Sequence, residues 1–91
     1  MRRVKVSPER FKEIRDEKGI TAYALARLID SSPSHMWRLT SGRYTTSYRF
    51  LDRMVPVLGL SGVADIIADE GQREAFVLWH IATHEAIRKT A

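Results

Sequence analysis

The chain has 91 residues, a formal net charge of +4 and no cysteine. This length suits one domain with a modest core rather than a deep catalytic cleft, and the lack of cysteine excludes disulfides and thiolate metal sites. The charge is uneven, because residues 1–53 hold twelve Lys and Arg against six Asp and Glu, whereas residues 54–91 hold three against five. A basic half of this kind is typical of nucleic-acid binding, although an ordinary solvated surface can give the same balance.

The first predicted helix follows a basic N-terminal stretch. Ser7 can cap it, and Pro8 stands at the first helical position, where a missing N–H costs no hydrogen bond. Phe11 and Ile14 lie one turn apart and face inward, and Gly19 ends the helix. No apolar region follows the basic start, so no signal peptide is predicted.

Two short helices follow with almost no linker, at about residues 21–30 and 32–41. Thr21 can cap the first, and Ser32 with Pro33 caps and begins the second. Apolar residues recur at helical spacing, at Leu25, Leu28 and Ile29 in the first helix and at Met36 and Leu39 in the second. Two helices joined by so few residues must cross steeply.

The second of these helices has an outward face without acidic side chains. With Met36 and Leu39 inward, this face consists of Ser32, Pro33, Ser34, Trp37, Arg38 and Ser41. Gly42, just past the end, suits a left-handed C-cap. An indole beside a guanidinium on such a face suits a polyanion.

Three more helices are predicted beyond this pair. The fourth begins near Thr46 and should kink or end near Val55, because Pro56 removes a hydrogen bond. The fifth begins near Ser61. Residues 72–89 contain no Gly or Pro and can form a last helix about 27 Å long. Proline and glycine interrupt the apolar run before it, so we predict no membrane span and a soluble, cytoplasmic protein.

These residues and their spacing resemble the helix-turn-helix domain of phage repressors and of small bacterial regulators of the XRE type. The resemblance covers about residues 11–67 and is carried by Arg15, Gly19, Thr21, Leu25, Ala26, Met36, Leu39, Gly42 and Arg43, and further along by Thr46, Phe50, Leu58, Gly59 and Leu60. It implies an all-α fold, with a five-helix repressor-like DNA-binding domain in residues 1–70 and a C-terminal helix in residues 71–91. It also implies a sequence-specific regulator of transcription that binds double-stranded DNA.

The chain departs from the family pattern at several positions. Ala22 replaces the Gln that often braces a phosphate in the family, so that contact is lost. Asp30 stands in the turn where the family has Gly, and we expect it to adopt a left-handed conformation, which Asp tolerates. Thr40 replaces a Glu that pairs with the basic residue of the first helix, so Arg15 needs another partner, such as Asp52 or a phosphate.

The resemblance gives the outward residues candidate roles in DNA binding. Arg38 can bond O6 and N7 of guanine in the major groove, a phosphate contact being the alternative. Trp37 can lie on thymine methyls or a sugar, or else fold back over the preceding helix. Ser32, Pro33 and Ser34 approach bases or phosphates, Ser41 completes the face, and Arg43, Tyr44, Thr45, Thr46 and Arg49 meet phosphates. Arg2, Arg3 and Lys5 form either an arm that enters the minor groove or a disordered tail.

The last helix is apolar around more of its circumference than one core face requires. Either it packs across its own domain or it pairs with a second subunit, and we favour a homodimer because DNA readers of this type bind paired half-sites. Phe76, Trp79 and Ile87 are the predicted dimer contacts. A dimer would present two copies of the helix at about residues 32–41, the recognition helix, about 34 Å apart.

Two histidines on this helix have the spacing of zinc ligands. His80 and His84 lie four residues apart, with Glu85 adjacent. The sequence shows no third ligand, since the remaining histidine, His35, belongs to the recognition helix. We therefore predict that no metal binds and that the two histidines lie at an interface or on the surface.

The leading prediction is a dimeric transcriptional repressor. No Gly-rich phosphate loop, Ser-His-Asp order or carboxylate pair in an apolar setting indicates an enzyme, and no cofactor is expected. Two alternatives stay open. One is an antitoxin that represses its own operon and holds a toxin, and the other is a protein-interaction module that uses the same scaffold without DNA, with Trp37 as an exposed anchor.

Overall fold

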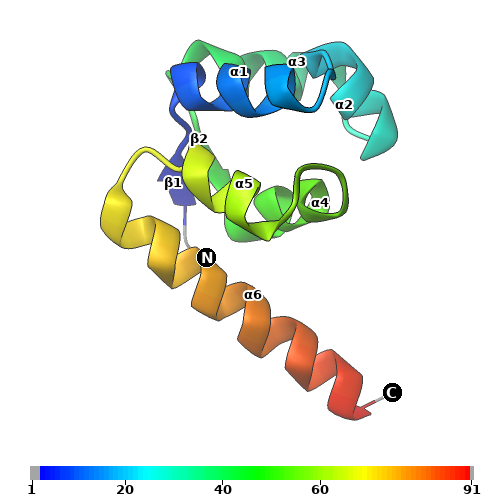
Figure 1. Ribbon diagram of the computed structural model, residues 1–91, viewed down its shortest axis with the longest axis vertical. Coiled ribbons are helices and arrows are strands. Elements are labelled where there is room, and N and C mark those ends of the chain that lie inside the picture. Colours follow the sequence, from blue (N-terminus) through cyan, green and yellow to red (C-terminus); the bar gives the residue numbers. More distant parts are fainter. Residues whose placement is uncertain (1–2, 91) are drawn as a thin grey trace.

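The structure is a computed structural model that describes the backbone of residues 3–90 and the side chains of residues 3–85. Its elements in chain order are β1 (Arg3–Lys5), α1 (Pro8–Glu17), α2 (Ala22–Leu28), α3 (Pro33–Ser41), β2 (Thr45–Ser47), α4 (Tyr48–Leu58), α5 (Leu60–Ile66) and α6 (Glu70–Thr90). In Figure 1, α1, α2 and α3 form one layer, α4 and α5 form a second, and α6 lies beyond the second layer. The predicted helical fold is confirmed, with a small two-stranded sheet in addition.

Serine or threonine caps four of the helices at their N-termini. Ser7, Thr21 and Ser32 each accept a hydrogen bond from the backbone N–H three residues along, as predicted, and Ser47 does the same for α4. Such a cap contributes about 0.5–2 kcal/mol. These local bonds explain why the beginnings of α1, α2 and α3 could be read from the sequence.

The turn between α2 and α3 contains a left-handed residue, as predicted. Asp30 has a φ of 55°, and Gly42, which ends α3, has a φ of 73°. The guanidinium of Arg53 on α4 donates hydrogen bonds to the carbonyl oxygens of Ile29 and Asp30. These oxygens stand at the end of α2, where carbonyls lack helical partners. Arg53 therefore ties the turn to α4.

One core draws side chains from all six helices and from β1. Its largest fully buried members include Val4, Phe11, Leu25, Met36, Leu39, Leu51, Met54, Ile66 and Phe76. Full burial of one such side chain contributes about 1.5–3 kcal/mol. Phe11, Met36 and Leu39 come from the faces predicted to point inward on α1 and α3.

Leu28 is an exception to the predicted apolar stripe of α2. Its side chain is 65% exposed, whereas Leu25 and Ala26 are fully buried and Ile29 is nearly so. At about 100° per residue, Leu28 lies about 60° from Leu25 on one side, while Ala26 and Ile29 lie on the other. The inward face is therefore centred away from Leu28.

The N-terminal strand pairs with the segment that follows α3. β1 and β2 are antiparallel, with Val4 opposite Thr46, and both residues are buried. Because residues 45–47 form β2, α4 begins at Tyr48 and not near Thr46 as predicted. The pairing joins the chain before α1 to the chain after α3.

The start of the chain is also bound to the end of α5. The backbone N–H of Ser7 donates to the carbonyl of Ile66 at 2.7 Å, and that of Ala68 donates to the carbonyl of Lys5 at 2.9 Å. Of the two alternatives for Arg3 and Lys5, the disordered tail is therefore wrong. Arg2, the first residue of the predicted arm, lies outside the described residues.

Pro56 was predicted to kink or end α4 near Val55, and the helix does not end there, because it continues to Leu58. Proline removes one helical hydrogen bond. Met54 and Leu58, on either side of it, are buried, and the N–H of Gly59 still bonds the carbonyl of Val55 at 2.8 Å. Burial on both sides of the proline outweighs the lost bond.

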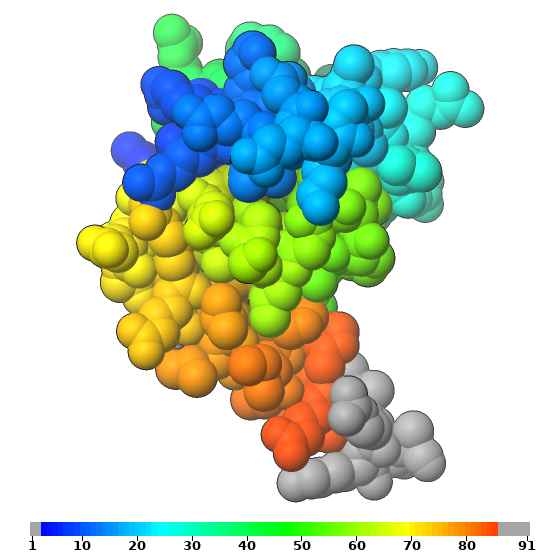
Figure 2. All heavy atoms as spheres, viewed as in Figure 1, coloured from blue at the N-terminus to red at the C-terminus, as the bar shows by residue number. Residues whose placement is uncertain are grey.

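The first half of α6 packs on the α4–α5 layer (Figure 2). Phe76 is fully buried against Tyr48, with ring centroids 5.4 Å apart, and Trp79 is half-buried 5.5 Å from the same ring. Phe76 was predicted as a dimer contact, but its own chain covers it. Among the described side chains of α6, the exposed large apolar ones are Leu78 and Ile81, at 60% and 49%. Within the described part of the chain, none of the helices is long and apolar enough to cross a membrane.

Replacing Gly42 with alanine should destabilise the fold more than replacing Gly19. Both glycines have a positive φ, which costs an L-residue about 1–2 kcal/mol. A Cβ at Gly42 would also lie 2.6 Å from Cγ of Pro8, whereas a Cβ at Gly19 would meet nothing within 4 Å. In urea unfolding we expect a loss of about 1 kcal/mol for Gly19→Ala and a clearly larger loss for Gly42→Ala. Equal losses would show that Pro8 does not limit the space at Gly42.

Candidate nucleic-acid interface

The predicted outward face of α3 is exposed. Met36 and Leu39 are buried, which turns Trp37 and Arg38 outward, and Trp37 is 63% exposed. An open hollow of about 440 Å³ lies beside Pro33, Ser34, Trp37 and Arg38. A smaller apolar hollow of about 130 Å³ lies between Trp37 and Tyr23 of α2. The indole is therefore largely exposed, and it lies next to Tyr23 of α2 across this hollow.

Arg38 is held beside the ring of Tyr44. The guanidinium carbon lies 5.7 Å from the ring centroid, a cation–π contact that contributes about 0.5–1 kcal/mol at an exposed site. Ser41 Oγ donates to the Arg38 carbonyl at 2.7 Å and accepts from the Arg43 N–H at 3.3 Å. The hydroxyl of Ser41, which is half-buried, thus shapes the end of α3, and Tyr44 orients Arg38.

The segment after α3 exposes some of its predicted DNA contacts and buries one. Arg43, Tyr44 and Arg49 are exposed, as predicted. Thr46 is only 1% exposed, because it lies opposite Val4 in the sheet, and so the prediction that it meets a phosphate is wrong.

Arg3 lies next to the same segment. Its Nε donates to Thr45 Oγ1 at 2.9 Å, and its Nη2 donates to the Thr45 carbonyl at 2.7 Å. The β1–β2 pairing thereby places this arginine in a fixed position, where sequence reasoning had left it on an arm or a tail. Arg3 is therefore a folded part of the candidate interface.

His35 of α3 lies where several positive charges converge. Its ring packs on Phe50, with centroids 4.2 Å apart. Burial lowers the pKa of His35, and the charges of Arg38, Arg3 and Arg53 lower it further. Because these arginines come from α3, β1 and α4, their common effect on one ring indicates a single region of positive potential.

Sequence reasoning missed Tyr23 and Arg53. Tyr23 is 61% exposed next to the hollow at Trp37. Its place on α2, away from Leu25 and Ile29, was a signal that could have found it. No local pattern pointed to Arg53, because the turn carbonyls that it binds lie 23 and 24 residues earlier in the chain.

Arg15 does not pair with Asp52, one of its two predicted partners. Its guanidinium lies 4.7 Å from the centroid of the Phe11 ring, and burial lowers the pKa of Arg15. Within the described residues, its Nε has no hydrogen-bond partner. Asp52 is instead hydrogen-bonded to His80 and His84 of α6.

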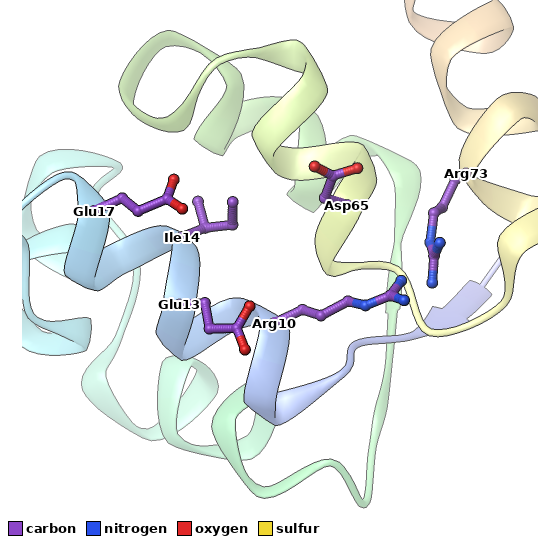
Figure 3. Close-up of a pocket in the computed structure, with 6 residues that line it drawn as sticks. All are labelled: Arg10, Glu13, Ile14, Glu17, Asp65 and Arg73. Atoms are coloured by element: carbon purple, nitrogen blue, oxygen red, sulfur yellow. The ribbon is translucent and has the colours of Figure 1, made fainter.

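A polar hollow of about 340 Å³ lies between α1, α5 and α6. Figure 3 shows the residues that line it, Arg10, Glu13, Ile14, Glu17, Asp65 and Arg73. Arg73 donates to the carbonyls of Ile67 at 2.7 Å and Ala68 at 3.3 Å, which fixes the approach to α6. The carboxylates that line this hollow, those of Glu13, Glu17 and Asp65, stand among arginines at an open surface.

Protonation of His35 should destabilise the fold at mildly acidic pH. Since burial and the arginines lower the pKa of His35 in the folded state, the unfolded chain, with its ordinary value of 6.5, takes up the proton more readily. The free energy of unfolding should therefore fall as the pH drops below about 6.5. In urea unfolding between pH 7 and pH 5, His35→Gln should show a smaller fall than the wild type. His80 and His84 are present in both proteins, so the difference isolates His35, and identical pH profiles would contradict the prediction.

A family model described as a helix-turn-helix domain matches residues 9–65, which is more than half of the chain. Comparison with curated proteins and with solved structures gave no match. The matched span runs from α1 into α5 and contains α2, the turn at Asp30 and α3. The predicted resemblance is thus confirmed. The chain belongs to the helix-turn-helix domain family of the phage-repressor-like XRE type, a family of DNA-binding domains.

Proposed function

We propose that this protein is a sequence-specific regulator of transcription that inserts α3 into the major groove of double-stranded DNA. The observation that carries the proposal is the exposed face of α3, on which Trp37 and Arg38 stand outward within a region of positive potential. Ser32, Pro33 and Ser34 leave the N-terminus of α3 exposed as well. Helix-turn-helix proteins contact base edges with this end of the second helix. The proposed function implies that the protein is located in the cytoplasm of a prokaryotic cell, where it can reach the chromosome.

Each exposed side chain has a proposed role. Arg38 reads guanine, since its planar guanidinium can bond O6 and N7 together. Trp37 supplies apolar surface for thymine methyl groups. Arg43 and Arg49, with Arg3 of β1, bind phosphates and position the protein without specifying the sequence. Each neutralised phosphate adds affinity that falls as the salt concentration rises.

The proposed regulator acts as a homodimeric repressor, with α6 as the contact between subunits. Leu78 and Ile81 are exposed apolar residues three positions apart on one helix, and Trp79, next to Leu78 in the sequence, is half-exposed. Exposed apolar side chains that lie close together favour association with another protein surface. Ile87, the third predicted dimer contact, has a side chain outside the described residues.

A second candidate is a protein-interaction module. Tyr23, Leu28 and Trp37 are each more than 60% exposed, and an apolar hollow separates the two aromatic residues. Such a surface also suits a protein partner. An antitoxin would combine both functions, with DNA on α3 and a toxin on α6.

Replacing Arg38 with alanine should weaken binding to the preferred duplex by about 1–3 kcal/mol, or roughly 5- to 150-fold. Fluorescence anisotropy with labelled duplexes at several salt concentrations measures this loss. Arg10→Ala is the matched control, because it removes the same charge from the hollow between α1, α5 and α6. An equal loss on preferred and random duplexes would assign Arg38 to a phosphate.

Selection of bound duplexes from a random pool tests the proposed function as a whole. We expect a palindromic consensus with half-sites about 34 Å apart, because two copies of α3 would face one side of the duplex. Absence of any enriched duplex at low salt would favour the protein-interaction module.

Replacing Leu78 with glutamate should convert a dimer to a monomer, since it places a charge in the proposed apolar contact. Sedimentation equilibrium of the wild type and the variant measures the change in mass. Leu28→Glu is the control, because Leu28 is equally exposed but lies on α2. A wild-type monomer at high protein concentration would exclude the dimer.

A further inference from the structure

Three side chains with metal-ligating atoms meet between α4 and α6. Asp52 of α4 is hydrogen-bonded through one carboxylate oxygen to His80 Nδ1 and through the other to His84 Nε2, the second at 2.8 Å. One ligating atom from each residue lies within 4.8 Å of the other two. Sequence reasoning found only the histidine pair, because Asp52 is 28 residues away from His80 along the chain.

The cluster is held in place by the packing of α6. Phe76, one turn before His80, is fully buried, which directs His80 toward α4. The two imidazole centroids lie 4.1 Å apart, as expected for residues one turn apart on one helix face. The side chains of Asp52 and His80 are only 20% and 16% exposed, so two of the three groups are already largely removed from water.

The cluster also has an open side. The side chain of His84 is 47% exposed, and a hollow of about 280 Å³ adjoins it, lined by Leu60, His80, Ile81, His84 and Glu85. A bound ion could therefore complete its coordination with water from this hollow. Zinc sites that have only three protein ligands usually hold water in the fourth coordination position.

We propose that Asp52, His80 and His84 form a binding site for a divalent transition-metal ion, with Zn²⁺ as the ion that fits best. Two imidazole nitrogens and one carboxylate oxygen are ligands that zinc takes readily, whereas magnesium and calcium prefer oxygen alone. Ligand atoms around a tetrahedral zinc ion are about 3.3 Å apart, which follows from bonds of about 2.0–2.1 Å. The two contacts between Asp52 and the histidines would lengthen toward this distance to admit the ion in place of the shared protons.

Such an ion would connect two parts of the chain. Asp52 belongs to the α4–α5 layer, and both histidines belong to α6, so the metal would fasten α6 to the body at a second place beyond Phe76. Because the ion binds the folded arrangement and not the unfolded chain, it would stabilise the protein in proportion to its concentration. This site does not depend on the DNA-binding proposal.

Isothermal titration of the full-length protein with zinc chloride tests the site. We expect one ion per chain, with a dissociation constant below about 100 μM, and a thermal midpoint that rises with added zinc but not with magnesium. His84→Gln, His80→Gln and Asp52→Asn should each weaken zinc binding by at least about tenfold. His35→Gln and Asp65→Asn are the matched controls, since they remove the same groups elsewhere, and they should bind zinc as the wild type does.

Two results would overturn the site. The first is a wild-type protein that shows no saturable zinc binding, and the second is a His84→Gln variant that binds as tightly as the wild type. His84 is half-exposed, so its replacement should leave the fold intact, which circular dichroism checks. Cobalt(II) gives a readout that needs no variant, because the wild type should develop the visible absorption of a four-coordinate cobalt ion that zinc then abolishes. If no such band appears, the three groups form only an ion-paired cluster between the two helices.

Discussion

The guanidinium of Arg53 binds the two carbonyls at the end of α2, and the position of α3 depends on this contact. The turn that it holds is short and passes through a left-handed aspartate, a conformation less favourable than that of the glycine common in the family. Without a donor from α4, the carbonyls would rely on water alone. Arg53 lies near the proposed DNA-binding face but acts on the backbone, so its charge contributes both to the fold and to the positive potential.

The sheet complements this contact from the other end of α3. β2 begins three residues after Gly42, and its pairing with β1 fixes the direction in which the chain leaves the recognition helix. Arg3 then lies on Thr45, and Tyr44 lies on Arg38. The proposed phosphate-binding and base-reading groups are therefore attached to rigid elements on both sides of α3, which reduces the conformational entropy lost on binding.

Local features of the sequence predicted the helix starts and the left-handed residues. The hydroxyls of Ser7, Thr21 and Ser32 each accept a hydrogen bond from an N–H three residues along. The left-handed conformations of Asp30 and Gly42 depend on the sterics of those residues themselves. Each of these features is therefore caused by residues that lie close together in the sequence. The outward position of Trp37 and Arg38 followed in the same way from helical periodicity. These local features were enough to predict which side chains of α3 point outward.

The predictions that failed depend on partners far along the chain. Thr46 is buried because Val4 lies opposite it, and Phe76 is buried because Tyr48 lies across from it. Asp52 meets histidines 28 and 32 residues away, and no spacing rule relates those positions. The prediction that Leu28 is buried failed for a different reason. On a helix of only two turns, its side chain lies too close to the boundary of the buried face.

The order in which the chain is made gives the N-terminal strand a further meaning. Residues 3–6 are synthesised before their backbone partners, which lie at residues 45–47 and 66–68. Val4 and Val6, both buried, thus stay without their native cover until α5 has emerged from the ribosome. The helices between them can form early through local bonds, whereas closure of the domain must wait for contacts that are distant in sequence. A nascent chain that is released before residue 68 would expose an unpaired basic strand with two valines. Such a chain would be a target for chaperones or proteases and would not act as a shorter regulator.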